Sequence, residues 1–263
     1  MKKYSHKLQL TKNSRGVYSI DPSIGCSSGT KQSKRGCYDD CYAARIAKLY
    51  GYDFTKTVKR NFLNISEIEK IKRQIRKIKL PFVRMGTMGD PSEDWQHTIN
   101  ICKDLQSEIQ LKIFQETPKE IVIITKHWNN LTDSQLQEIK GLNICINTSI
   151  SVLDNSDLLH NSLHQYERIK PYCKSILRVV TCDFNKANEL GLHLATLQQD
   201  ILSKYKILDT VFRPSKNNKL ILDGVINVHK TKFLGKTSIV SKLNKKTYFG
   251  NCNNCIEMCG VNM

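Results

Sequence analysis

Short apolar runs alternate with longer amphipathic segments about six times along this chain, and this rhythm limits the folds open to it. In the longer segments apolar residues recur every three or four positions, as on one face of a helix. Strands that alternate with helices form a parallel sheet with right-handed crossovers, so we predict an α/β fold. The predicted strands cover 16–25, 82–86, 120–126, 143–151, 176–182 and 209–213, and the predicted helices cover 41–50, 66–79, 92–109, 132–141, 158–172 and 187–204.

The number of units indicates an incomplete barrel. Six strand–helix units fit a partial (β/α)6 TIM-like barrel with a parallel sheet better than a complete eight-fold barrel. This domain is expected over residues 1–215. Residues 216–263 are expected to form a short, basic, cysteine-rich C-terminal extension packed on the barrel, with a last strand or hairpin at 219–228.

Two capping-box patterns predict where helices begin. Ser66 is followed three positions later by Glu69, and Thr132 is followed by Gln135 in the same way. In such a box the side chain of each residue accepts a hydrogen bond from the backbone N–H of the other. Gly141 is expected to end the second of these helices.

Six of the ten cysteines lie in two groups of three, and these groups are the strongest chemical signal in the sequence. Thiolates this close together usually hold a soft metal or an iron–sulfur cluster. The other four cysteines stand at apolar positions of predicted strands and helices, where we expect them to pack in the core. The two triplets are Cys26, Cys37 and Cys41 (C-x10-C-x3-C), and Cys252, Cys255 and Cys259 (C-x2-C-x3-C); the four core cysteines are Cys102, Cys145, Cys173 and Cys182.

The sequence indicates a reducing compartment. No apolar run approaches the length of roughly eighteen residues that a membrane span needs. The first sixteen residues also lack the apolar stretch of a secretion signal. We therefore expect a cytoplasmic protein without membrane contact, in which disulfides are rare and the triplets are ligands.

Which metal the triplets bind stays open at this point. Three thiolates can hold three irons of a [4Fe–4S] cluster and leave the fourth iron free for a ligand. Zinc competes at both triplets, because sites with three cysteines and one histidine are common. At the C-terminal triplet a second iron–sulfur cluster or zinc are the two interpretations. A single site shared by both triplets is a third.

The charge of the chain suggests a polyanionic partner. Lysine and arginine number 41 against 24 acidic residues, which gives a net charge of +17. The predicted helix 66–79 has a basic face, and segment 216–246 contains eight lysines but a single acid, Asp223. An excess of this kind is typical of proteins that bind nucleic acid. Solvated surface lysines are the simpler alternative.

Three features of the sequence resemble the radical S-adenosylmethionine (radical SAM) superfamily. The first is the cysteine triplet after the first strand, which runs into Tyr42-Ala43 as in the phage and mobile-element branch. The second is Met88-Gly89-Asp90-Pro91 after the second strand, where the family has GGEP. The third is the six-fold strand–helix rhythm. The spacing differs from the usual C-x3-C-x2-C, and Asp40 stands where the family has an aromatic residue.

The resemblance implies a cofactor site and a reaction. Cys26, Cys37 and Cys41 would ligate a [4Fe–4S] cluster whose open iron is chelated by S-adenosylmethionine (SAM). A reduced cluster, supplied by an external donor similar to flavodoxin or ferredoxin, would cleave SAM to a 5′-deoxyadenosyl radical that modifies a substrate, possible substrates including nucleic acid. The residues that would bind SAM are Tyr38 or Tyr42 at the adenine, Gly89 and Asp90 at the ammonium group, Asn147, Ser149 or Ser151 at the ribose or carboxylate, and Arg178 at the carboxylate.

Other functions are also compatible with the sequence. The chain could be a radical SAM enzyme acting on a peptide or metabolite, or a non-catalytic, zinc-stabilised, basic nucleic-acid-binding protein. Asp90 followed by Pro91 also has the pattern of an ordinary helix cap. Arg178 could equally form a simple salt bridge. A P-loop and a G-x-G-x-x-G motif are both absent from the sequence, which argues against a nucleoside triphosphatase or a Rossmann reductase.

Overall fold

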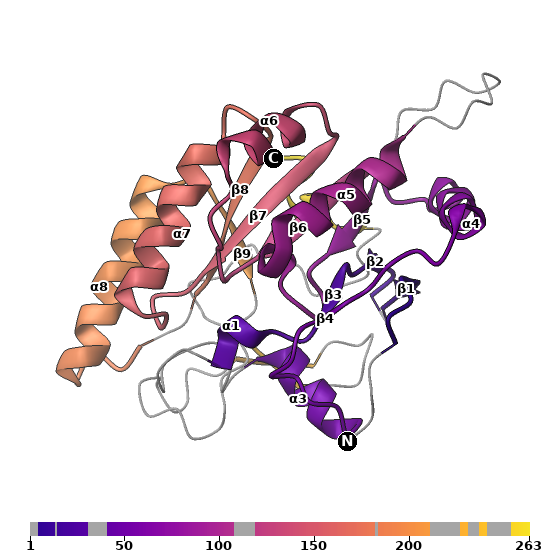
Figure 1. The fold of residues 1–263 in the computed structure, drawn as a ribbon. Helices are drawn as coiled ribbons and strands as arrows, with labels where there is room; N and C mark the ends of the chain where they lie inside the picture. Colours follow the sequence, from indigo (N-terminus) through magenta and orange to yellow (C-terminus); the bar gives the residue numbers. More distant parts are fainter. Residues whose placement is uncertain are drawn as a thin grey trace.

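The computed structural model describes residues 5–13, 15–30, 41–107, 119–181, 184–210, 227–230, 237–240 and 254–263. Its centre is a seven-stranded sheet with the order β1-β2-β5-β6-β7-β8-β9 (Figure 1). The strands are β1 (Leu10–Lys12), β2 (Tyr18–Ile20), β5 (Phe82–Met85), β6 (Glu120–Thr125), β7 (Ile144–Ile150), β8 (Lys174–Val180) and β9 (Ile207–Thr210).

Six strands of this sheet are parallel and follow one another in chain order, from β2 through β5 to β9. This confirms the predicted α/β class and its parallel sheet. β1 adds an antiparallel edge that the sequence did not reveal. Two small antiparallel pairs lie outside this sheet: β3 (Ser23–Ile24) with β4 (Val58–Lys59), and β10 (Asn227–Lys230) with β11 (Thr237–Val240). Of the predicted last strand or hairpin at 219–228, only Asn227 and Val228 are described, and both belong to β10; residues 219–226 lie outside the described residues.

Helices α5 to α8 cover one face of the sheet (Figure 1). The helices are α1 (Ser27–Thr30), α3 (Tyr42–Leu49), α4 (Ile65–Arg76), η1 (Pro91–Asp94), α5 (Trp95–Gln106), α6 (Asp133–Lys140), α7 (Ser156–Ile169), α8 (Glu189–Lys204) and η3 (Met258–Gly260). None of the described helices has the length and apolar character needed to span a membrane.

One predicted helix cap is confirmed and the other is wrong. Thr132 and Gln135 form the full capping box of α6, and Gly141 follows its last residue as the C-cap. At α4 the cap is Asn64, whose side chain accepts from the N–H of Glu67 at 3.0 Å. Ser66 lies inside the first turn, because the extended backbone that a cap requires occurs at Asn64.

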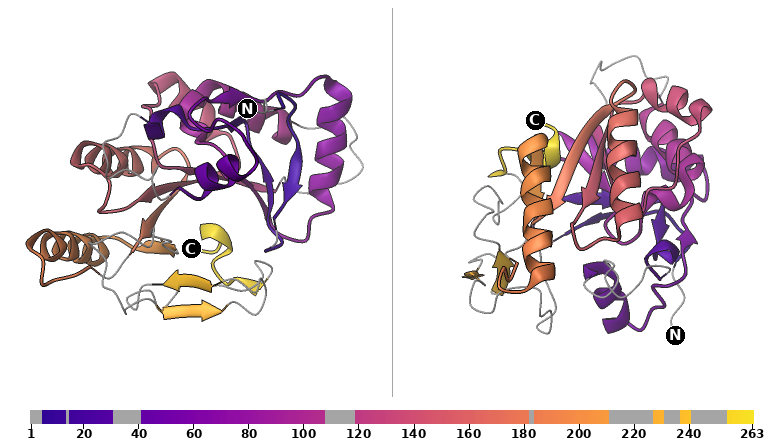
Figure 2. Two further views of the ribbon diagram at one scale, coloured as in Figure 1. Left: turned by 90° about the horizontal axis from the view of Figure 1, so that it is seen from below. Right: turned by 90° about the vertical axis from the view of Figure 1, so that its left-hand side faces the viewer.

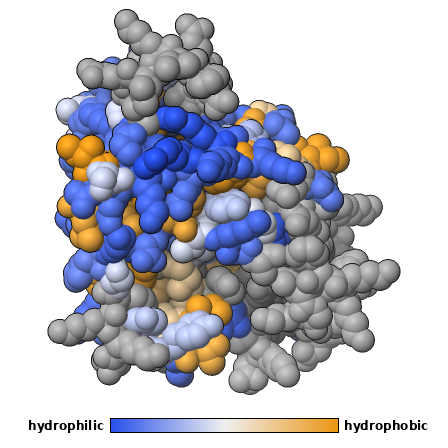
Figure 3. All heavy atoms as spheres, turned by 90° about the vertical axis from the view of Figure 1, so that its right-hand side faces the viewer, coloured by the Kyte–Doolittle hydropathy of each residue, from blue (hydrophilic) through white to orange (hydrophobic). Residues whose placement is uncertain are grey.

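The outer surface of α4 is basic. Its exposed side chains, together with two beyond its end, include five basic residues. Figure 3 shows that hydrophilic residues form a band across this face of the molecule. These residues are Lys70, Arg73, Arg76, Lys77 and Lys79.

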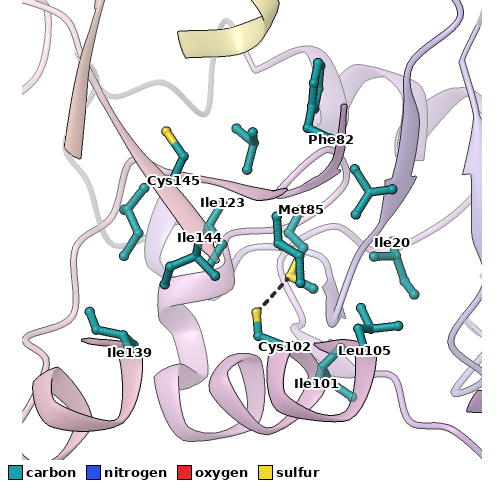
Figure 4. Close-up of a cluster of buried hydrophobic side chains, with 14 of the residues drawn as sticks. Ile20, Phe82, Met85, Ile101, Cys102, Leu105, Ile123, Ile139, Ile144 and Cys145 are labelled. Atoms are coloured by element: carbon teal, nitrogen blue, oxygen red, sulfur yellow. Dashed lines mark hydrogen bonds between the residues drawn. The ribbon is translucent and has the colours of Figure 1, made fainter. Parts of the chain in front are cut away.

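The main core lies between the sheet and the helices. Met85, Ile123 and Ile144 point from the strands toward α5 and α6 (Figure 4). Cys102 of α5 meets Met85 there, with 3.9 Å between the two sulfur atoms. Cys102 and Cys145 are fully buried, which confirms their predicted core positions. Cys173 is half-buried beside the same core, and Cys182 lies outside the described residues.

The other face of the sheet, here called the inner face, is contacted by residues 254–263. Because side chains alternate along a strand, this face receives Arg84 of β5, Asn147 and Ser149 of β7, and Ile176 and Arg178 of β8. The C-terminal segment lies on the side of the sheet away from α5 to α7 (Figure 2). The Asn147 amide donates to the Cys259 carbonyl at 2.8 Å, and the Lys174 ammonium donates to the Val261 carbonyl.

Candidate functional site

The loop that follows β5, residues 86–90, lies at the carboxyl edge of the parallel strands. Gly86 has φ +87°, and a Cβ there would lie 2.1 Å from the Ile124 carbonyl oxygen, so only glycine fits. The buried carboxylate of Asp21, which follows β2, accepts the N–H groups of Gly86, Thr87 and Met88 at 2.9, 2.9 and 3.2 Å. The loop is therefore fixed to the neighbouring strand.

The same loop is joined to the segment that carries the first cysteine. Gly25 and Gly89 form a parallel bridge, and the Gly25 N–H donates to the Met88 carbonyl at 2.9 Å. A Cβ on Gly89 would lie 2.6 Å from the Ser23 carbonyl oxygen, which explains why glycine occupies this position. The motif that resembles GGEP thus lies directly beside Cys26.

Asp90 acts as a structural cap and cross-link. Its carboxylate accepts from the Ser92 N–H at 3.0 Å, the Thr125 hydroxyl at 2.6 Å, and the N–H groups of Lys126 and His127 at 2.8 and 2.7 Å. These contacts confirm the capping alternative and tie the loop to the end of β6. The carboxylate has four hydrogen bonds already, so a direct role for it at an ammonium group loses support.

Two cysteines of the first triplet share one cluster at this edge. Cys26 is buried together with Ala43, Ala47 and Phe54, and Cys41 and Met88 pack against that cluster. Burial raises the pKa of the Cys26 thiol above its ordinary value, and the nearby carboxylate of Asp90 raises it further. A soft metal would displace that proton, because the thiolate is the ligand. Cys37 lies outside the described residues.

Glu93 is a member of this site that sequence analysis missed. Its carboxylate accepts from the Ser27 hydroxyl at 2.6 Å and the Ser28 N–H at 2.8 Å, and one oxygen lies 3.8 Å from the Cys26 sulfur. Burial opposes its ionisation, but the hydrogen bonds from Ser27 and Ser28 lower the pKa of Glu93 overall. The only signal was its place in the MGDPSED run, three residues after Asp90.

Two cysteines of the second triplet belong to the C-terminal segment that contacts the inner face. Cys255 and Cys259 are half-buried, and Cys252 lies outside the described residues. Cys259 has φ +58°, and the neighbouring Gly260 fits closely against Ile176 of β8. Within the described part of the chain, no group of three or more His, Cys, Asp or Glu side chains could hold a metal ion. Each triplet has one cysteine beyond that part.

The polar residues predicted at the ends of β7 have different surroundings. Asn147 is fully buried and bound to Cys259, and its side-chain oxygen lies 3.3 Å from the Cys145 sulfur. Ser151 forms a local turn, in which its hydroxyl accepts from the Leu153 N–H at 3.2 Å. Ser149 stands opposite Arg178 in the register of β7 and β8. Tyr38 and the side chain of Tyr42 lie outside the described residues.

Two arginines on the inner face have buried nitrogens without a partner. Among the described residues, Nε of Arg84 and both Nε and Nη1 of Arg178 make no hydrogen bond. The same holds for the buried hydroxyl of Thr87. Arg178 was predicted from the sequence and Arg84 was not, although Arg84 is the one charged residue in the apolar strand FVRM. Native proteins pair nearly all buried polar atoms, so these atoms indicate a place for a ligand.

No model of a protein family matches this sequence, and neither a curated protein nor a solved structure matches it.

Proposed function

We propose that this chain is a radical SAM enzyme built on a partial (β/α)6 TIM-like barrel. One observation carries the proposal: Cys26 and Cys41 cluster beside the Met88-Gly89 loop at the carboxyl edge of a parallel sheet. In α/β enzymes with parallel strands, active sites form at this edge. Soft thiols in such a place are suited to an iron–sulfur cluster and not to core packing alone.

The residues present fit the cofactors of this family. Cys26, Cys37 and Cys41 would ligate a [4Fe–4S] cluster. The Thr87 hydroxyl, which has no partner among the described residues, belongs to the loop bridged to Gly25 and fits a polar ligand. When bound and reduced, the cluster supplies the electron that cleaves SAM to methionine and a 5′-deoxyadenosyl radical. The C-terminal cysteines would hold a second iron–sulfur cluster or zinc.

The protein's own contribution is a rigid loop and a set of polar groups. Asp21 and Asp90 hold the loop on both sides, so the backbone around Gly89, and not the Asp90 carboxylate, would meet the ammonium group of SAM. Ser149 and Arg178 remain candidates for the ribose and the carboxylate, and Tyr38 or Tyr42 for the adenine. Asn147 and Ser151 are weaker candidates, because both already hold neighbouring segments of the chain.

We further propose a polyanionic substrate, with nucleic acid as the first choice. The exposed basic side chains of α4 support this choice, because such a face attracts phosphates (Figure 3). The lysine-rich segment 216–246 falls mostly outside the described residues. A cytoplasmic enzyme of this type would also need an external electron donor.

Anaerobic purification followed by metal analysis tests the proposal. We expect a brown protein containing iron and sulfide, which releases 5′-deoxyadenosine when SAM and dithionite are added. Cys37→Ala should remove the iron–sulfur cluster needed for this release, and Cys255→Ala should remove only the second metal. Cys102→Ala is the matched control, because Cys102 is a core residue and should leave all metal in place.

Three results would count against the proposal. Zinc without iron would favour the non-catalytic, zinc-stabilised nucleic-acid-binding protein. Iron without 5′-deoxyadenosine would exclude the radical reaction. Loss of all bound metal, iron and zinc alike, on either cysteine substitution would indicate that the two triplets form one site.

A further inference from the structure

Arg84 and Arg178 face the same region from two separate strands. Arg84 lies on β5, paired with Val122 of β6, and Arg178 lies on β8, paired with Ser149 of β7. Both positions belong to the inner face, where the C-terminal segment also packs. Burial lowers the pKa of Arg178 most, the charge and hydrogen bond of the Cys259 side chain raise it, and the positive charge of Arg84 lowers it.

The described residues leave this pair of positive charges without a carboxylate partner. No ion pair among them includes Arg84 or Arg178. Asp21 is electrostatically coupled to Arg84, but its oxygens accept three backbone N–H groups. Glu120, also on this face, interacts with Lys174 and Cys145 nearer the amino ends of the strands.

Two like charges with desolvated, unpaired nitrogens are costly. Removing a charged group from water without a partner costs several kcal/mol, and a second charge of the same sign increases that cost. A bound anion would offset both the desolvation cost and the repulsion between the two charges. Guanidinium groups offer forked donors that match the oxygens of phosphate and carboxylate.

We propose that Arg84 and Arg178 together form an oxyanion site that takes a phosphate group of the substrate. A phosphate group matches two guanidiniums better than a carboxylate does, because it offers more oxygens and carries up to two charges. The net charge of +17 also favours a phosphate-bearing ligand. The assignment to a substrate phosphate rests on the proposed function, but phosphate binding at these two arginines can be measured whether or not the radical reaction occurs. The carboxylate of SAM, which Arg178 alone would serve, is the competing source of an oxyanion.

Phosphate binding by the full-length protein tests this site without SAM or a reductant. Inorganic phosphate should raise the melting temperature of the wild type in a phosphate-free buffer and bind measurably by calorimetry. Arg84→Gln and Arg178→Gln should each weaken binding by about tenfold or more, since each removes charge-assisted hydrogen bonds. Arg84→Lys should recover part of the affinity. Arg168→Gln is the control, because Arg168 pairs with Asp133 at the surface.

Stability without phosphate gives a second, independent readout. If the arginines are unpaired, Arg84→Gln and Arg178→Gln should melt at the same temperature as the wild type or higher. Unfolding or a clear drop in the melting temperature would mean that the chain itself pairs these charges, and the proposal would fall. Unchanged phosphate affinity in both variants would overturn it as well. Methionine binding as tightly as phosphate and competing with it would assign the site to the cofactor carboxylate instead.

Discussion

Replacing Asp90 by asparagine should destabilise the protein strongly, although the two side chains have nearly the same shape. One oxygen of Asp90 accepts from Ser92 and Thr125, and the other accepts from Lys126 and His127. In asparagine one of these oxygens becomes an NH2 group. The best orientation turns that NH2 toward the Thr125 hydroxyl, which can accept, and leaves the Ser92 N–H unsatisfied.

The magnitude follows from this count of hydrogen bonds. Three bonds weaken from charge-assisted to neutral, at about 1 kcal/mol each, and one buried N–H loses its partner at about 1–3 kcal/mol. We expect Asp90→Asn to lower the free energy of unfolding by roughly 4–6 kcal/mol, measured by urea denaturation with an unchanged m-value. Asp133→Asn, which loses one exposed ion pair with Arg168, should cost less than about 1 kcal/mol.

The reasoning would be refuted if Asp90→Asn were as stable as Asp133→Asn. If it were equally stable but had lost its affinity for SAM, the carboxylate would face the cofactor, as the family resemblance implies. A stable variant with normal SAM binding would leave Asp90 with neither role.

Two further substitutions test the loop and the inner face. Gly86→Ala should lower the free energy of unfolding by more than about 3 kcal/mol, measured by urea denaturation, because the new Cβ would clash with the Ile124 carbonyl oxygen. Gly51 is the control: it has φ +76° but open space around it, so Gly51→Ala should lower the free energy by only about 1–2 kcal/mol. Equal losses in the two variants would contradict the clash. Asn147→Ala should lower the free energy of unfolding by about 1–3 kcal/mol, because it removes the hydrogen bond to the Cys259 carbonyl. It should also speed amide hydrogen exchange in residues 254–263. Unchanged exchange there would show that other contacts hold the segment.

The sequence predicted the parallel sheet because its signals are local. Each strand from β5 to β9 overlaps a predicted strand, and the errors are shifts of about two residues at β8 and β9. β1 and β4 were missed because each has only two or three residues, too few for a periodic pattern. The predicted strand 16–25 is divided in the structure into β2 and β3. The cap of α4 was misplaced because two capping-type residues, Asn64 and Ser66, stand two positions apart.

The candidate site was predictable in its residues but less so in their roles. The cysteines and the MGDP run are visible as motifs, and Cys26 and Cys41 do share a cluster. The role of Asp90 depends on donors at positions 125–127, and that of Asp21 on donors at 86–88. Such partners lie more than thirty positions away, so no local pattern records them. Arg84 escaped notice because its neighbours identify a buried strand.

The double anchoring of the loop after β5 limits how its motif can be reused. Asp21, which follows β2, binds the loop on one side, and Asp90, at the end of the loop, binds the backbone that follows β6 on the other side. If the MGDP segment alone were grafted into another scaffold, it would lack the hydrogen bonds that fix its conformation here. Transplanting the binding surface would require both carboxylates, Gly25 and the adjoining strand ends as a unit.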